Sequence, residues 1–177
     1  NMPYKKPNLA IINEGDIMDI INDFSLIFEV EDGSFFERSS GELVYQNKPL
    51  GLILKGCIIE YQYKIDNHYL LFTSMSSPYN EEVHIYYLDI NFNIDDHIKI
   101  MDCINITSCS TLTDIKIIND RTLSIAFITE KLWKLKIFKN PKLYLYAWRP
   151  IHAFRPEKKL SDKVHMGISH YLSRAAP

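Results

Sequence analysis

The chain has 177 residues, of which 46% are hydrophobic and 24% are charged, and its net charge is −2 at pH 7. This length fits one domain of roughly 100–200 residues, so we expect a single domain over residues 1–177. The balance of hydrophobic and charged residues excludes an intrinsically disordered chain. Three cysteines, an odd number, argue against a disulfide scaffold.

The N-terminal end predicts neither a signal peptide nor a membrane span. Its basic start is followed by a single apolar run, Leu9–Ile12, which is too short for either. We therefore expect a cytoplasmic protein with no membrane partner. Further along, Ile17, Ile20, Ile21 and Phe24 follow the spacing i, i+3, i+4, i+7, which predicts a short N-terminal helix.

The middle of the chain predicts an antiparallel meander. Its runs of β-branched and aromatic residues favour strands, and turn residues separate them at close spacing. Trp133, Leu135 and Ile137 share one face of a strand, and we assign that face to the core because lysines occupy the other. The predicted strands are Ser25–Val30, Leu52–Tyr63, Tyr69–Ser74, Val83–Ile90, His97–Met101, Leu112–Ile118, Thr122–Ile128, Leu132–Phe138 and Leu143–Ala147.

The C-terminal end predicts a second helix. Ser161 can cap a helix that runs to about Ser173, and its apolar stripe would consist of Val164, Ile168, Tyr171 and Leu172. The expected fold class is therefore mainly β, a β-rich α+β protein. Its meander would form a curved sheet, a sandwich or a partial barrel, with one short helix at each end.

Charge is unevenly distributed along the chain. Between Asn13 and Gln46, nine acidic residues face one basic residue, Arg38, which gives that stretch a charge of −8. From Arg149 to the C-terminus, six basic residues outnumber two acidic ones, a charge of +4. Such separation can steer a partner of opposite charge toward one face, or the two stretches can lie side by side and neutralise each other.

The sequence contains no motif for catalysis or for cofactor binding. It has no glycine-rich phosphate loop, no HExxH pattern, no nucleophile elbow and no CxxC pair. Cys103 and Cys109 lack the further ligands that a structural metal site needs. We therefore predict no catalytic residue, no cofactor and no metal site.

In general style, the acidic, strand-rich chain resembles the small cytoplasmic immunity proteins of bacterial toxin systems, including those of contact-dependent growth inhibition. The resemblance transfers no residue. It implies a non-enzymatic protein that neutralises a cognate toxin, often a basic nuclease, by occluding its active site. We place the expected partner-binding surface on eight acidic residues: Asp16, Asp19, Asp23, Glu29, Glu31, Asp32, Glu37 and Glu42.

Two alternatives stay open. The first is an RNA-binding or RNA-cleaving protein that acts through the basic C-terminal segment, where His165 and His170 could serve in acid–base catalysis. Nucleic acid is nevertheless disfavoured as a partner, because few basic residues lie among the tyrosines that could stack on bases. These rings, which core packing also explains, are Tyr61, Tyr63, Tyr86, Tyr87, Tyr144 and Tyr146. The second alternative is an assembly subunit joined through exposed sheet edges, and the oligomeric state is left open.

Overall fold

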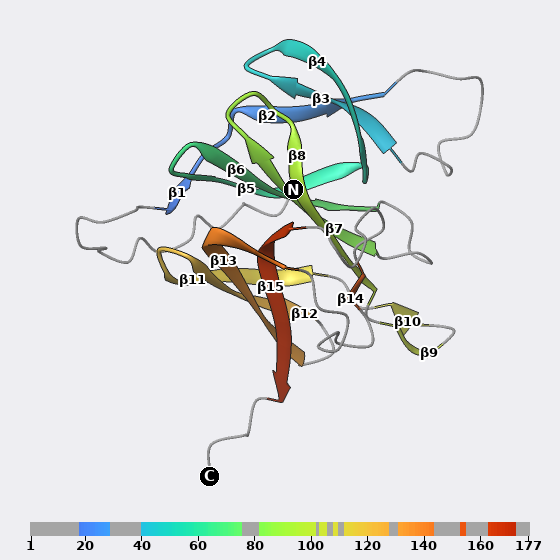
Figure 1. Cartoon of the computed structure of the whole chain (residues 1–177). Helices are drawn as coiled ribbons and strands as arrows, with labels where there is room; N and C mark the ends of the chain where they lie inside the picture. Colours follow the sequence, from blue (N-terminus) through green and yellow to red (C-terminus); the bar gives the residue numbers. More distant parts are fainter. Residues whose placement is uncertain are drawn as a thin grey trace.

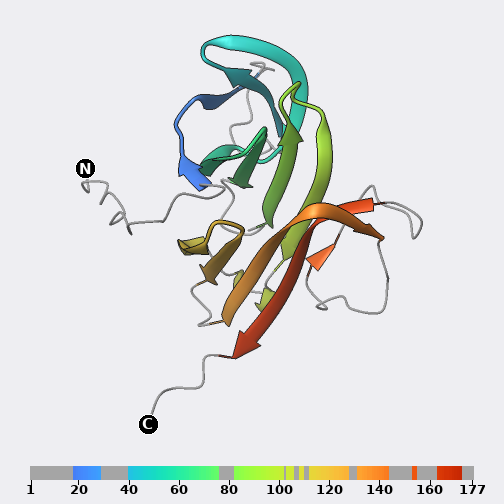
Figure 2. The ribbon, with the colours of Figure 1, turned by 60° about the vertical axis from the view of Figure 1, so that its left-hand side comes forward.

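Three antiparallel sheets stack on one another in the structure, a computed structural model (Figures 1 and 2). The structure describes residues 18–28, 40–75, 82–101, 103–105, 108–109, 112–127, 131–143, 153–154 and 163–172. All regular elements within these ranges are strands. They are β1 Met18–Ile20, β2 Phe24–Ile27, β3 Ser40–Tyr45, β4 Lys48–Lys55, β5 Ile58–Ile65, β6 His68–Ser74, β7 Glu82–Asp89, β8 Ile94–Met101, β9 Cys103–Asn105, β10 Ser108–Cys109, β11 Leu112–Asn119, β12 Thr122–Phe127, β13 Lys131–Leu143, β14 Ala153–Phe154 and β15 Lys163–Leu172.

The middle layer is a six-stranded sheet with the order β1-β5-β6-β7-β8-β14, called the central sheet below. A three-stranded sheet, β2-β3-β4, covers one of its faces, and a four-stranded sheet, β11-β12-β13-β15, covers the other. The strands β9 and β10 form a small separate pair. The protein is thus a layered β-sandwich with three main sheets, which matches the sandwich among the predicted alternatives and adds a third layer to it.

Burial of the central sheet on both faces explains its sequence. Every residue from Tyr69 to Thr73 in β6 and from Val83 to Leu88 in β7 is buried. Leu70 packs in the cluster beneath the four-stranded sheet, whereas its neighbour Leu71 packs in the cluster beneath the three-stranded sheet. Strands that are covered on both sides have continuous apolar runs, since neither face meets water.

The strand pattern predicted for β13 is confirmed. Trp133, Leu135 and Ile137 are all buried in the core, whereas Lys134 and Lys136 are exposed. The four-stranded sheet therefore has one apolar face toward the central sheet and one polar face toward solvent, as expected for an outer layer of a sandwich.

Other predicted strands are confirmed with shifted bounds. The predicted strand Leu52–Tyr63 is two strands, because the chain turns at Gly56, whose φ is +115°. The strand predicted to begin at His97 begins at Ile94, and most of Leu143–Ala147 lies outside the described residues.

The predicted N-terminal helix is wrong where the structure describes it. Instead, β1 pairs with β5, β2 pairs with β3, and Ile21 lies between β1 and β2. Met18 and Phe24 are buried in different core clusters, whereas Ile20 is 57% exposed. One helix face cannot reach two layers, and β-branched residues pair well in strands. Ile17 lies outside the described residues.

The predicted C-terminal helix is also wrong over Lys163–Leu172, which form β15 antiparallel to β13. Val164 and Met166 are buried at alternate positions, which is the period of a strand. Between β15 and β13 the chain approaches closely at Gly167, where a Cβ atom would lie 2.7 Å from Cζ of Phe138. The ends of the predicted helix lie outside the described residues. Within the described part of the chain, no helix has the length and apolar character needed to cross a membrane.

Asp96 of β8 connects the central sheet to the four-stranded sheet. Its side chain is fully buried, and its Oδ2 atom accepts hydrogen bonds from the backbone N–H groups of His165 and Met166, both at 2.9 Å. Its Oδ1 atom accepts from the backbone N–H of His97, also at 2.9 Å. One carboxylate therefore satisfies three backbone donors and fixes β15 against β8.

Replacement of Asp96 by alanine should destabilise the fold strongly. The substitution Asp96→Ala leaves three backbone N–H groups without this acceptor, and we expect a loss of about 3 kcal/mol in the free energy of unfolding. Urea denaturation measures it, with Asp114→Ala as the control, because the Asp114 side chain is 47% exposed. Equal unfolding midpoints for the two variants would contradict this role of Asp96.

Candidate functional site

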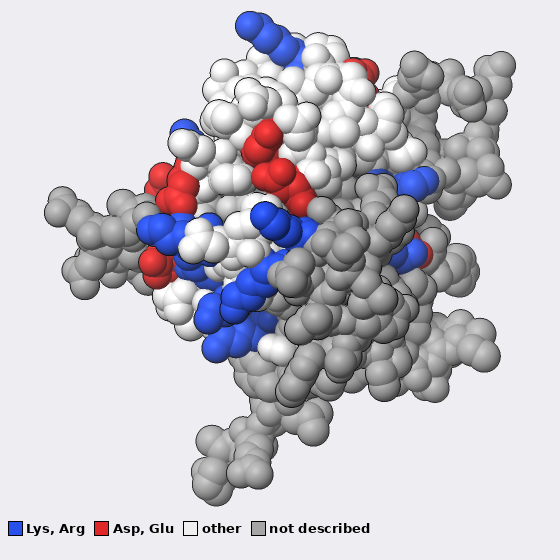
Figure 3. All heavy atoms as spheres, in the orientation of Figure 1, with Lys and Arg blue, Asp and Glu red and all other residues white. Residues whose placement is uncertain are grey.

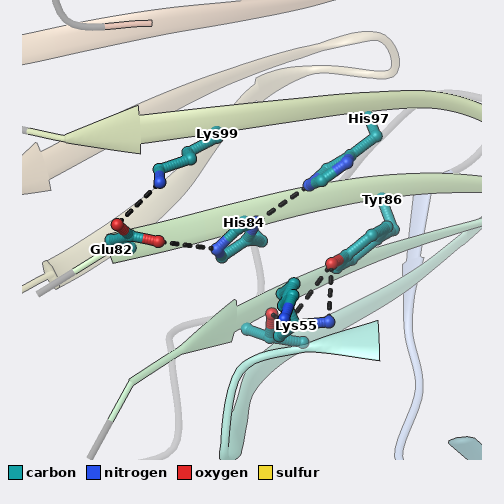
Figure 4. A network of polar contacts seen from close by, with 7 residues as sticks. Lys55, Glu82, His84, Tyr86, His97 and Lys99 are labelled. Carbon is teal, nitrogen blue, oxygen red and sulfur yellow. Dashed lines mark hydrogen bonds and ion pairs between the residues drawn. The ribbon is translucent and has the colours of Figure 1, made fainter. Parts of the chain in front are cut away.

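The densest cluster of titratable side chains lies across β7 and β8 (Figure 4). Nζ of Lys99 lies 2.6 Å from Oε1 of Glu82, and Oε2 of Glu82 lies 3.3 Å from Nε2 of His84. Nδ1 of His84 lies 2.9 Å from Nε2 of His97. The cluster forms because Lys99 pairs with His84, and His97 with Tyr86, in the register of the two strands.

The order of donors and acceptors in this chain of contacts follows from its ends. The Glu82 carboxylate can only accept, so Nε2 of His84 donates to it and Nδ1 of neutral His84 accepts from Nε2 of His97. Burial lowers the pKa of His84 below its usual value. Burial, with the neighbouring His84 and Lys99, lowers the pKa of His97 to about 3. Both imidazoles are therefore neutral at pH 7.

This cluster stabilises a junction between layers. The Tyr86 ring stacks on His97 with 4.3 Å between ring centroids, and its hydroxyl accepts from the backbone N–H of Lys55 at 2.8 Å. Thr73 donates to the Lys55 carbonyl at 2.6 Å, beside the turn at Gly56 where β4 passes into β5. The two histidines are 3% and 6% exposed, so their nitrogens do not meet a substrate in solution.

The histidine cluster was not predicted from the sequence, because the pairing of β7 with β8 leaves no local pattern. The one available signal was the alternation of His84 and Tyr86 on one strand face. Among the described residues, no three side chains of the metal-binding types come together in a way that could hold a metal ion.

The eight predicted partner-binding acids are only partly described. Asp19 is exposed on β1 opposite Lys64, Asp23 is partly buried between β1 and β2, and Glu42 lies in the middle strand of the three-stranded sheet. The other five lie outside the described residues: Asp16, Glu29, Glu31, Asp32 and Glu37.

Glu42 lies at the centre of a row that we call the Ile-Glu-Ile row. In the strand register Glu42 is directly opposite Ile27 of β2 and Ile53 of β4. These isoleucines are 45% and 61% exposed, so the outer face of the three-stranded sheet presents apolar side chains on both sides of a carboxylate. Oε1 of Glu42 accepts from the backbone N–H of Gly51 at 2.8 Å, which holds the acid in place.

The predicted histidine pair does not form an open site in the described part of the chain. His165 is partly buried, its ring lies 5.5 Å from that of Tyr87, and its backbone N–H donates to Asp96. The side chain of His170 lies outside the described residues.

The tyrosines that could have stacked on bases are explained by packing where they are described. Tyr63, Tyr86 and Tyr87 are buried, and Tyr61 packs partly buried against the core. Tyr144 and Tyr146 lie outside the described residues.

Comparisons of this chain with protein-family models, with curated proteins and with solved structures find no match. Function is therefore inferred from the described surfaces alone. The histidine cluster is enclosed, whereas the Ile-Glu-Ile row is accessible, so the row is the stronger candidate for contact with a partner.

The buried histidines should make stability depend on pH. The unfolded chain binds a proton on His97 near pH 6.5, but the folded chain does so only near pH 3. Above about pH 6.5, His97 therefore causes no loss in the free energy of unfolding. Below that pH, the titration of His97 lowers the free energy of unfolding by about 1.4 kcal/mol per pH unit. His97→Gln keeps a donor for His84 but cannot titrate, so its stability should fall less steeply between about pH 6 and pH 4.

Urea denaturation at several pH values measures this difference, with the stability of each protein at about pH 8 as its reference. Because the same carboxylates titrate in both proteins, they cancel in the comparison. Parallel stability curves for the wild type and His97→Gln would show that His97 titrates alike in the folded and unfolded chain.

Proposed function

We propose that the protein is a non-enzymatic protein-binding module and that its partner docks on the outer face of the three-stranded sheet. The Ile-Glu-Ile row is the observation that supports this proposal. Exposed isoleucines on a sheet face provide the apolar area that the centre of a protein interface needs, and a central acid adds specificity. A partner with a basic rim fits this surface.

The acidic stretch of the sequence supports the same surface. Glu29, Glu31, Asp32 and Glu37 belong to the segment that joins β2 to β3. This segment leaves β2 after Ile27 and enters β3 two residues before Glu42, so both of its ends adjoin the row. Acidic charge beside an apolar centre speeds association with a basic partner and excludes acidic ones.

In its specific form, the proposal is an immunity protein that acts in the cytoplasm. It would neutralise a cognate toxin, such as a basic nuclease, by covering the toxin's active site. Two features support this form: the acidic stretch of the sequence, and the enclosure of the histidine cluster between sheets. An inhibitor of this kind needs only a rigid surface of matching shape and charge, which a layered β-sandwich provides.

The proposal is tested by binding to the proteins that neighbouring genes encode. Calorimetry should detect a complex with one of them that is a toxin, and co-expression should restore growth of cells that produce it. The double variant Ile27→Ser/Ile53→Ser should weaken the complex at least about tenfold. Ile118→Ser is the matched control, because Ile118 is 51% exposed on β11 of the other outer sheet.

Two results would contradict the proposal. One is the absence of any complex with these proteins. The other is an equal affinity of the row variant and the Ile118→Ser control, which would remove the outer face of the three-stranded sheet from the interface.

A further inference from the structure

The outer face of the four-stranded sheet carries an ordered array of lysines and serines. In the strand register, Lys116 of β11 is opposite Ser124 of β12, which is opposite Lys134 of β13, which is opposite Ser169 of β15. This row therefore alternates a cation with a hydroxyl across all four strands. Lys136 lies two residues further along β13, about 7 Å away, opposite Gly167 of β15.

This face is strongly basic. The exposed lysines of the four strands are Lys116, Lys134, Lys136, Lys139, Lys142 and Lys163. The one acidic residue in these strands is Asp114, whose carboxylate lies 3.6 Å from Nζ of Lys116. Figure 3 shows blue side chains gathered over this sheet, with acidic side chains at their upper border. The basic face combines β15 with strands far away in sequence, so the charge of the C-terminal segment alone underestimates it.

A shallow hollow lies over β13 and the edge strand β15 of this sheet. It has a volume of about 360 Å³ and is lined by Lys134, Lys136, Phe138, Gly167, Ile168 and Ser169. Of these lining residues, Gly167 is directly opposite Lys136 in the strand register. The Phe138 ring lies against Gly167, and Nζ of Lys142 lies 4.5 Å from the centre of that ring. The hollow thus combines an aromatic ring with two exposed cations.

We propose that this face binds single-stranded RNA, with one base against Phe138 and the neighbouring phosphates on Lys134 and Lys136. Cations that follow the backbone, together with an aromatic ring for stacking, are the two features of single-strand binding surfaces. Within the described residues, this twisted sheet presents no helix that could enter the major groove of a duplex. The serines between the lysines can hydrogen-bond to ribose 2′-hydroxyl groups, which favours RNA over DNA.

This surface is independent of the proposed protein-docking face. The central sheet separates the four-stranded sheet from the three-stranded sheet, so no residue of the hollow belongs to the Ile-Glu-Ile row. Failure of one proposal leaves the other standing.

Fluorescence anisotropy of the full chain with a short labelled single-stranded RNA of mixed sequence tests the proposal. Lys134→Ala/Lys136→Ala should weaken binding about tenfold and reduce the salt slope by about 1.4, which is about 0.7 for each phosphate that the variant no longer neutralises. Lys48→Ala/Lys64→Ala is the control, because it removes two exposed lysines from other sheets and the same charge. Phe138→Leu should weaken binding about tenfold with the salt slope unchanged, since stacking is not ionic.

Two competitors distinguish RNA from other anions. Single-stranded DNA of the same sequence should bind more weakly than RNA, and polyglutamate should compete poorly. The proposal is overturned if RNA does not bind at low salt, if the two double-lysine variants lose the same affinity, or if polyglutamate competes as well as RNA. Equal binding of DNA and RNA would overturn the choice of RNA as the occupant.

Discussion

The fold depends on the burial of the central sheet on both faces. Because β6 and β7 have apolar side chains on either side, neither face tolerates water, and each requires a covering layer. The three-stranded and four-stranded sheets supply these layers, and each uses one face to do so. Their other faces are exposed to solvent, and these two outer faces are among the surfaces on which the described chain can meet other molecules.

The polar groups that lie between the sheets are consistent with burial of the central sheet on both faces. Asp96 is buried yet satisfied by three backbone donors, and His84 and His97 are buried as a neutral pair anchored to Glu82. Leaving any of these groups without a partner would cost more than its hydrogen bond contributes. Their geometry fixes how strands and sheets align, and burial at these positions lowers the pKa values of both histidines.

The sequence predicted those elements whose pattern a single strand determines. Trp133, Leu135 and Ile137 alternate with lysines, and this local signal gave the correct core face of β13. The helices were predicted wrongly because the apolar spacings around Ile20 and Ile168 also fit strands. In the N-terminal case, the apolar residues belong to strands of two different sheets. Glu42 was among the predicted partner-binding acids, but the isoleucines beside it and the array of lysines and serines were not predicted. The Ile-Glu-Ile row and the Lys134–Ser169 pairing arise from strand neighbours, and a local period predicts which face a side chain occupies but not which strand lies beside it.

The acidic and basic stretches of the sequence contribute strands to different outer sheets. Where it is described, the acidic stretch supplies β1 to the central sheet and β2 and β3 to the three-stranded sheet. The described part of the basic stretch supplies β14 to the central sheet and β15, beside the lysines of β13, to the four-stranded sheet. The exposed lysines of the four-stranded sheet form a basic face, and such a face can orient the molecule as it approaches an acidic partner. Because the central sheet and the two core layers on its faces separate the outer faces, contact at one outer face leaves the other accessible.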